Sequence, residues 1–218
     1  MNSEDSTNPA VYWDNIYRTK PPEALSWTRD NSSGVVSGWL EQIHLAPGQG
    51  VLDVGGGHSP LLDLLLERGC GPITVLDLSQ TALEQAQIRL GEKGKAVRWQ
   101  VGDITTTPLE RDQYVLWHDR ATFHFLTDAA ARERYLERVR TAVQRGGHLM
   151  LSTFAPDGPE KCSGLPVQRY SAEALLELFT PHFRLRAEKR ELHHTPWGAV
   201  QPFTCVWLER VSTKDSLE

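Results

Sequence analysis

Short apolar segments alternate with helical segments from residue 51 onward, and this alternation constrains the fold more than any other feature of the sequence. Strands separated by helices predict a mainly parallel sheet with right-handed crossover connections. Two late strand segments, 183–192 and 203–208, have no helix between them and predict an antiparallel hairpin at the sheet edge. We therefore expect an α/β fold with a doubly wound, mainly parallel, seven-stranded sheet and an antiparallel edge hairpin. The five earlier strands are expected at 51–54, 73–76, 97–101, 114–117 and 148–153.

Helix signals fill the intervals between these strands. Ser59 followed by Pro60 is typical of an N-cap and a first helical residue. Ser79 or Thr81 is expected to cap the helix after the second strand. A charged segment over 128–144 carries an apolar stripe and predicts a longer helix. Further helices are expected near 11–17, near 35–43 and after Ser171.

Composition and charge narrow the class of protein. The chain has 23 Lys and Arg against 28 Asp and Glu, and this net charge of −5 disfavours a dedicated nucleic-acid binder. No apolar run approaches the roughly 18 residues of a membrane span, and the first 20 residues lack the apolar core of a secretory signal. Three separated cysteines and the histidine spacings indicate neither a disulfide framework nor a metal site. We expect a cytoplasmic protein, monomeric or weakly dimeric, without a membrane or nucleic-acid partner.

Three strand ends carry the residues with the clearest chemistry. The first strand ends in Gly55-Gly56-Gly57, where the backbone can approach a ligand closely and the next helix offers free amides. The second strand ends at Asp77 and the third at Asp103. Ligands of such sheets bind beyond the carboxyl ends of the strands, where a carboxylate can reach a pair of ribose hydroxyls. The sequence therefore predicts a nucleoside-binding site.

Other nucleotide sites fit the glycine segment less well. A dinucleotide fingerprint counted from Gly55 requires a small residue at position 60, where this chain has Pro60. No G-K-[ST] follows the first strand, which excludes a P-loop. A dinucleotide-dependent oxidoreductase and a non-catalytic nucleoside-cofactor-binding module stay open as alternatives.

The segment V-L-D-V-G-G-G-H-S at 51–59 resembles motif I of class I S-adenosylmethionine-dependent methyltransferases, with Asp53 two residues before the G-x-G. V-L-D-L-S and V-G-D-I resemble the second and third motifs of that family. The resemblance implies a Rossmann-like fold and S-adenosyl-L-methionine as the cofactor. It also implies that Asp53 holds the glycine loop through its amides, that Asp77 binds the ribose, and that Asp103 and Ile104 lie beside the adenine.

The N-terminal region narrows this resemblance to one subgroup. Y-W-D-x-x-Y at 12–17, Trp27, and D-R-A-T at 119–122 resemble the elongation-factor lysine methyltransferases, and the same features occur in many uncharacterised bacterial proteins. The subgroup implies a protein lysine as the methyl acceptor, whereas a cleft roofed by residues 155–168 would suit a small molecule. The expected cofactor-binding residues are Trp27, Asp53, Gly55, Gly56, Gly57, Asp77, Leu78, Asp103, Ile104 and His118.

The resemblance also implies a domain organisation. A single methyltransferase domain is expected over 1–218. It would consist of an N-terminal helical cap at 1–48, a cofactor-binding core at 49–155, and a substrate-side lid with the edge hairpin at 156–211.

Ionisable side chains follow the fourth strand, where the methyl group and its acceptor should meet. A proton acceptor needs reach and a pKa near the working pH, which suits His and Asp. We expect catalytic roles for Asp119 and His124, with His118 and His194 as further candidate bases. Asp119 could also anchor the methionine part of the cofactor.

Overall fold

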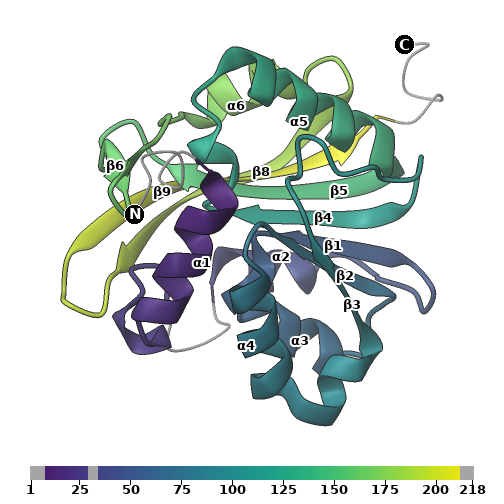
Figure 1. The fold of residues 1–218 in the computed structure, drawn as a ribbon. Helices are drawn as coiled ribbons and strands as arrows, with labels where there is room; N and C mark the ends of the chain where they lie inside the picture. The colour runs from purple at the N-terminus through teal and green to yellow at the C-terminus, as the bar shows by residue number, and fades with distance from the viewer. Residues whose placement is uncertain (1–7, 29–33, 212–218) are drawn as a thin grey trace.

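A computed structural model describes residues 8–28 and 34–211 and contains one seven-stranded sheet (Figure 1). The strand order is β3-β2-β1-β4-β5-β9-β8, which confirms the predicted α/β architecture. The first five strands of this order run parallel, and β9 pairs antiparallel with both β5 and β8. The strands are β1 Gly50–Val54, β2 Ile73–Asp77, β3 Val97–Val101, β4 Tyr114–Arg120, β5 Val143–Phe154, β8 Phe183–His194 and β9 Val200–Arg210.

Helices cover both faces of the sheet and create two apolar layers. Side chains of α2, α3 and α4 pack with Val51, Leu116 and Met150 on one face. Side chains of α5 and α6 pack with Leu52 and Trp117 on the other face. Figure 1 shows these helix groups on opposite sides of the sheet. The helices are α1 Pro9–Thr19, α2 Val35–Leu40, α3 Leu61–Glu67, α4 Gln80–Leu90, α5 Ala129–Ala142 and α6 Ala172–Phe179, with 3₁₀ turns η1 Pro22–Ala24, η2 Gly56–His58, η3 Gly91–Ala96 and η4 Phe123–Phe125.

The junction between α5 and β5 differs from the sequence prediction. Helix α5 ends at Ala142, because Val143 adopts extended backbone and pairs with Tyr114 of β4. Strand β5 therefore begins five residues before the expected His148. The turn at Gly146, with φ of 74°, lies inside this strand and does not terminate the helix.

The structure confirms the predicted cap of α4 and contradicts the predicted cap of α3. Ser79 caps α4, since its hydroxyl accepts a hydrogen bond from the Ala82 amide at 3.0 Å. Ser59 does not cap α3, because Pro60 occupies the N-cap position and makes no side-chain capping bond. Ser59 instead ends the 3₁₀ turn η2.

The loop after β5 forms a small hairpin of its own. Strands β6 Lys161–Cys162 and β7 Leu165–Pro166 pair antiparallel. The Tyr12 hydroxyl donates a hydrogen bond to the Ser163 carbonyl in the turn of this hairpin. Helix α1 is therefore tied to the segment that we expected to act as a lid. The parts of the expected N-terminal cap at 1–7 and 29–33 lie outside the described residues.

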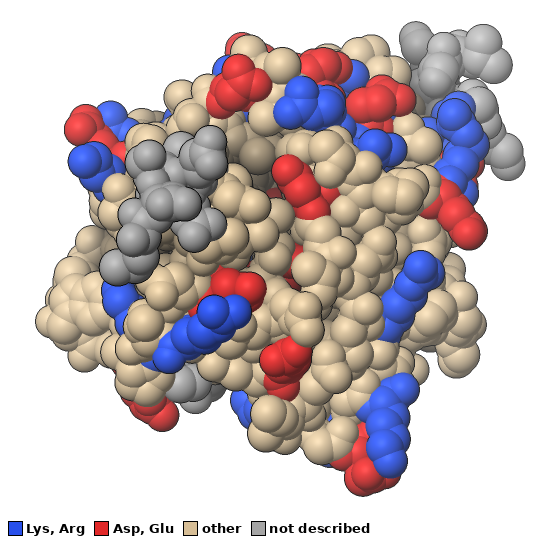
Figure 2. Space-filling view, in the orientation of Figure 1, with Lys and Arg blue, Asp and Glu red and all other residues tan. Residues whose placement is uncertain are grey.

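The charge distribution on the surface is relevant to nucleic-acid binding, and the length of the helices is relevant to a membrane crossing. On the face shown in Figure 2, acidic and basic side chains are interspersed, which differs from the basic patch of a typical nucleic-acid binder. Within 8–28 and 34–211, no helix has both the length and the apolar character that a bilayer crossing requires.

Candidate active site

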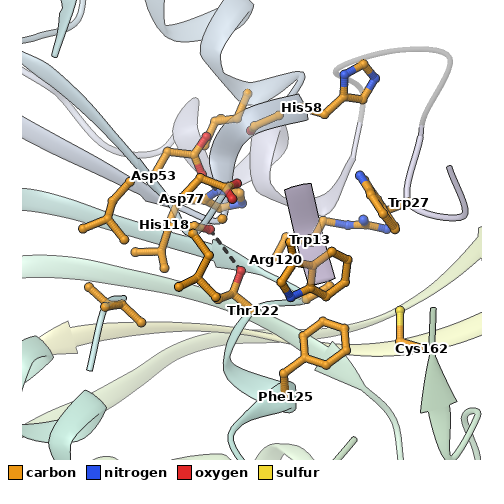
Figure 3. A pocket seen from close by; sticks show the side chains of 18 of the residues that line it. Trp13, Trp27, Asp53, His58, Asp77, His118, Arg120, Thr122, Phe125 and Cys162 are labelled. Atoms are coloured by element: carbon orange, nitrogen blue, oxygen red, sulfur yellow. Dashed lines mark hydrogen bonds and ion pairs between the residues drawn. The ribbon is translucent and has the colours of Figure 1, made fainter. Parts of the chain in front are cut away.

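A cavity of about 410 Å³ opens at the carboxyl ends of β1 and β4, where the strand order reverses. Ligands of open α/β sheets bind at such switch points. One part of the wall, which we call the aspartate half, consists of Asp77, Leu78, Asp103 and Ile104. The opposite part, the apolar half, consists of Trp13, Phe125, Cys162, Leu165, Pro166 and Phe203. Figure 3 shows Asp77 on one side of the cavity and Phe125 and Cys162 on the other.

The three glycines after β1 have different roles. Gly55 lines the cavity and adopts φ of 65°, and a side chain there would collide with the Thr122 hydroxyl. Gly56 and Gly57 are buried beneath the cavity wall. A Cβ atom on Gly57 would lie 2.5 Å from the Cβ of Ala82, so close packing against α4 requires this glycine. The prediction that all three glycines touch the cofactor therefore needs correction for Gly56 and Gly57.

Asp77 holds the glycine turn in place. Its Oδ2 accepts a hydrogen bond from the Gly57 amide at 3.0 Å, and its Oδ1 accepts one from the Ser79 amide at 2.9 Å. Burial raises the pKa of this carboxyl to about 6, against the lowering effect of the two amides. Each carboxylate oxygen has a second lone pair. Asp77 can therefore keep both amides and still accept hydrogen bonds from a ligand in the cavity.

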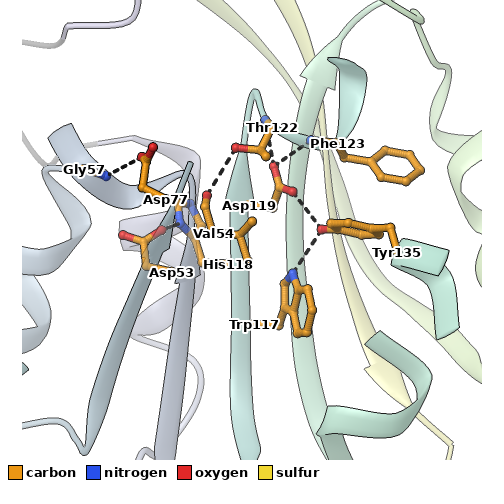
Figure 4. A network of polar contacts seen from close by, with 10 residues as sticks. All are labelled: Asp53, Val54, Gly57, Asp77, Trp117, His118, Asp119, Thr122, Phe123 and Tyr135. Atoms are coloured by element: carbon orange, nitrogen blue, oxygen red, sulfur yellow. Dashed lines mark hydrogen bonds and ion pairs between the residues drawn. The ribbon is translucent and has the colours of Figure 1, made fainter. Parts of the chain in front are cut away.

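Asp53 pairs with a histidine on the neighbouring strand. Its Oδ1 lies 2.7 Å from Nδ1 of His118, and the two residues are in register across β1 and β4 (Figure 4). Asp53 was expected to accept amide hydrogen bonds from the glycine loop, but Asp77 accepts the Gly57 amide instead. Asp53 Oδ2 is buried and has no hydrogen-bond partner among the described residues.

The third strand end is also positioned as predicted. Asp103 Oδ1 accepts a hydrogen bond from the Thr105 amide at 2.7 Å, which fixes the turn after β3. Ile104 is buried beside it, and both residues line the cavity. Trp27 lines the cavity as well, and its ring contacts the rings of Trp13 and Tyr17 edge-on.

Asp119, predicted to be catalytic, does not line the cavity. Its carboxylate accepts hydrogen bonds from the Thr122 and Phe123 amides and from the Tyr135 hydroxyl at 2.7 Å (Figure 4). Successive side chains of a strand point to opposite faces, so Asp119 faces α5 while His118 faces the cavity. Full burial raises the pKa of Asp119 to about 6. The geometry assigns Asp119 a structural role in the turn after β4.

His124, the second predicted catalytic residue, also lies outside the cavity. Its side chain is fully buried among the rings of Phe125, Phe154 and Phe203. Nδ1 accepts a hydrogen bond from the Phe154 amide at 3.3 Å. Burial lowers the pKa of His124 to about 3, so the ring stays neutral in the folded protein. This histidine therefore belongs to the core.

The late histidines do not reach the cavity wall either. His193 is buried, and its Nε2 lies 2.5 Å from the Ser26 carbonyl. His194 is exposed on β8. Neither residue is among those that line the cavity. Within the ranges that the structure describes, no group of three or more His, Cys, Asp or Glu could hold a metal ion.

Sequence reasoning missed Arg120 as a cavity residue. It lies two residues after His118 on the same face of β4, and its guanidinium lies 4.5 Å from the centre of the Phe203 ring. An Nη atom is 3.6 Å from the Glu191 carboxylate on β8. The alternation of side chains along β4 is the signal that would have identified Arg120.

The role of the Y-W-D-x-x-Y segment also becomes clear. Asp14 accepts hydrogen bonds from the Ser79 hydroxyl at 2.6 Å and from the Thr81 amide at 3.0 Å, which docks α1 on α4. This docking places Trp13 and Tyr17 on the cavity wall. The segment therefore supplies Trp13 of the apolar half and a further aromatic residue of the cavity wall, Tyr17.

The residues of the cavity fit S-adenosylmethionine. Asp77 and Asp103 bring carboxylates to the cavity wall, the type of acceptor that ribose and adenine groups require. A buried carboxylate oxygen without a partner, such as Asp53 Oδ2, is costly unless a ligand supplies a donor. The α-ammonium of the methionine part is such a donor.

Comparisons with known proteins identify methyltransferases as similar to this chain. Residues 51–147 match a family described as a methyltransferase domain. The eEF1A lysine and N-terminal methyltransferase of Danio rerio is 28% identical over 151 residues, which cover 68% of this chain and 21% of that protein. The chain thus spans about a fifth of the length of this curated relative.

Solved structures share the fold. A SAM-dependent methyltransferase from Anabaena variabilis superimposes with a TM-score of 0.71 and 16% identity, over 93% of this chain and 95% of that chain. A structure described as "Conversion of a Disulfide Bond into a Thioacetal Group during Echinomycin Biosynthesis" gives a TM-score of 0.72 and 20% identity, with 95% of each chain covered. Residues 51–147 thus match a methyltransferase domain, and this match, the motifs and the fold support a class I S-adenosylmethionine-dependent methyltransferase.

Proposed function

We propose that this protein transfers a methyl group from S-adenosylmethionine to a small molecule with a largely apolar body. The observation that carries the proposal is the division of one cavity into an aspartate half and an apolar half, with His118 and Arg120 on its wall. The cofactor supplies an activated methyl group on a sulfonium. Because this group is already reactive, the protein must mainly align the acceptor with it.

The residues of the aspartate half would hold the cofactor. Asp77 would accept hydrogen bonds from the ribose hydroxyls, and Asp103 and Ile104 would lie at the adenine. Asp53 would accept from the methionine ammonium. These roles are supported by the position of all four residues on the cavity wall.

The apolar half would hold the acceptor. Aromatic rings and the β6–β7 hairpin supply its surface, and apolar walls with few polar groups are typical of small-molecule sites. Arg120 also lies on the cavity wall, where its guanidinium is paired with the Glu191 carboxylate at 3.6 Å. The surface left for the acceptor is therefore mainly apolar, which favours a small molecule with an apolar body over a protein lysine.

A protein lysine is the second candidate acceptor. The similarity to the Danio rerio eEF1A lysine and N-terminal methyltransferase favours it, although the chain covers 21% of that protein. The rings of Trp13 and Phe125, with centroids 5.1 Å apart, could also contact an alkyl chain. A single labelling experiment separates the two candidates.

The experiment supplies methyl-labelled S-adenosylmethionine and purified protein to a cell extract divided by ultrafiltration. We expect label in the filtrate, accompanied by an equal amount of S-adenosylhomocysteine. Label on lysine in the retained protein would overturn the small-molecule acceptor. Binding of S-adenosylhomocysteine in calorimetry without label in either fraction would favour a non-catalytic binding module. The Asp77→Ala variant serves as the control with weakened cofactor binding.

A further inference from the structure

We infer that His118, oriented by Asp53, takes up the proton that the methyl acceptor loses during transfer. This inference rests on the proposed methyl transfer and selects one of the candidate bases that the sequence analysis left open. His118 and Arg120 both line the cavity from β4, and His118 is in register with Asp53 of the neighbouring strand β1. The pair bridges the two strands at which the sheet order reverses.

The contact between the two residues is short and shielded from water. Asp53 Oδ1 and His118 Nδ1 are 2.7 Å apart, and their side chains are 1% and 6% exposed. A carboxylate accepts only, so the hydrogen between these atoms belongs to Nδ1 of a neutral imidazole. The lone pair of that ring is then on Nε2. His118 lines the cavity, and within residues 8–28 and 34–211 its ring makes a hydrogen bond at Nδ1 alone.

The other ionisable groups on the wall are less suited to this role. Asp77 already accepts two amides, and Asp103 accepts the Thr105 amide in the aspartate half. Figure 3 shows the His58 ring directed away from the cluster of Asp53, Asp77 and His118. His118 lines the same cavity, and its contact with Asp53 uses Nδ1, which leaves Nε2 for an acceptor.

The charges around His118 come from three strands. Asp53 faces it from β1 and Asp77 from β2, while Arg120 follows on its own strand. Asp119 lies on the opposite face of β4 and is close enough for the His118 charge to affect its pKa. Charges of both signs therefore surround the His118 ring.

The proton balance of the step is simple. The acceptor atom uses its lone pair to form a bond to the methyl carbon, and the electron pair of the carbon–sulfur bond stays on sulfur. The proton of the acceptor atom moves to Nε2 of His118, which becomes an imidazolium paired with the Asp53 carboxylate. S-adenosylhomocysteine and the methylated acceptor leave, and the proton passes to water.

The first test measures the tautomer of His118 without any acceptor. We expect nitrogen NMR of protein with labelled histidine to show hydrogen on Nδ1 and none on Nε2 in the neutral ring, with and without S-adenosylhomocysteine. Asp53→Asn should change this preference, because its amide can donate to Nδ1. Hydrogen on Nε2 of the neutral ring in the unsubstituted protein would overturn the inference.

The second test compares chemistry with cofactor binding, using the extract fraction that accepts label. His118→Gln should lower the single-turnover rate by about 10²–10⁴-fold, remove the loss of rate at acid pH, and leave the affinity for S-adenosylhomocysteine within threefold. His194→Gln, an exposed histidine on β8, should change neither quantity. An unchanged rate in His118→Gln, or equal losses of rate and affinity, would overturn the inference. Failure of the unsubstituted protein to transfer label would instead refute the proposed function.

Discussion

Asp119 and His118 are adjacent in the chain, yet they belong to different parts of the molecule. His118 faces the cavity and pairs with Asp53, whereas Asp119 faces α5 and holds the turn after β4. A sequence motif locates both residues at the end of the strand, and the alternation of a strand separates their roles. Substitutions at these two positions should therefore have different effects.

Replacement of Asp119 should affect stability more than chemistry. Asp119→Ala would leave the Thr122 and Phe123 amides and the Tyr135 hydroxyl without their acceptor, at a cost of about 1–3 kcal/mol for each buried group left unsatisfied. Chemical denaturation should show this loss, while the folded variant should bind S-adenosylhomocysteine as before. Asp119→Asn keeps an acceptor oxygen and should lose less. A tenfold weaker affinity at unchanged stability would restore Asp119 as a cofactor ligand.

Replacement of Asp77 should weaken cofactor binding. Hydrogen bonds to a charged group contribute about 1.5–3 kcal/mol, so calorimetry with Asp77→Ala should show a tenfold to hundredfold lower affinity for S-adenosylhomocysteine. The variant should also unfold more easily, since the Gly57 and Ser79 amides lose their acceptor. Asp63→Ala, which removes an exposed ion pair with Arg89, is the matched control. Equal affinities in both variants would refute the ribose assignment.

At the scale of elements, α1 depends on one carboxylate for its docking. Asp14→Ala removes the acceptor for the Ser79 hydroxyl and the Thr81 amide, at a cost of about 1–3 kcal/mol. Hydrogen exchange of the α1 amides should accelerate, while exchange in β1 and β4 stays slow. Arg18→Ala removes an exposed ion pair with the same carboxylate and should change exchange little. Equal exchange in the two variants would contradict the docking role of Asp14.

The sequence predicted the elements better than it predicted the position of each side chain. The strand–helix alternation predicted the sheet, its hairpin and the edge that carries Asp77 and Asp103. The sequence did not predict that Val143 belongs to β5, because the helical pattern extends through this residue. Pairing between Val143 and Tyr114 of β4 determines its extended backbone instead. The motif comparison placed Gly57 at the cofactor, whereas packing against Ala82 explains this glycine. Contacts between distant segments decided each of these differences.

Long-range contacts also explain why the sequence did not predict the apolar half of the cavity. Trp13, Phe125, Cys162 and Phe203 come from four separate regions of the chain. Only the folded chain brings them to one wall, and of these four residues only Trp13 belongs to a motif that the sequence analysis identified. The aspartate half could be predicted because successive parallel strands repeat the same pattern at their carboxyl ends.

At the scale of the whole molecule, two buried ionisable groups, Asp119 and His124, should change the free energy of unfolding in opposite directions as pH rises. Burial raises the pKa of Asp119 to about 6, so the folded protein binds more protons than the unfolded chain between pH of about 4 and 6. This group therefore lowers the free energy of unfolding as pH rises through that window. His124, with a pKa lowered to about 3, acts in the opposite direction between about 3 and 6.5.

Two variants separate these responses in denaturation curves measured from pH 4 to 7. Asp119→Asn should become relatively less stable than the unsubstituted protein toward pH 4, because it lacks the stabilising proton uptake. His124→Asn keeps an acceptor for the Phe154 amide and should become relatively more stable toward pH 4. Its methyl-transfer rate should stay unchanged. Parallel pH curves for all three proteins would contradict the burial of both groups.

The position of β9 has a consequence for synthesis on the ribosome. This strand, the last in the chain order of the sheet, lies between β5 and β8 and contributes side chains to both apolar layers. The β1–β4 region that forms the aspartate half leaves the ribosome well before β9 does, but Phe203 of the apolar half arrives with β9 itself. A nascent chain stalled before residue 200 therefore lacks the strand that joins β8 to β5 and the Phe203 ring of the apolar half. The apolar half is complete only after β9 has left the ribosome.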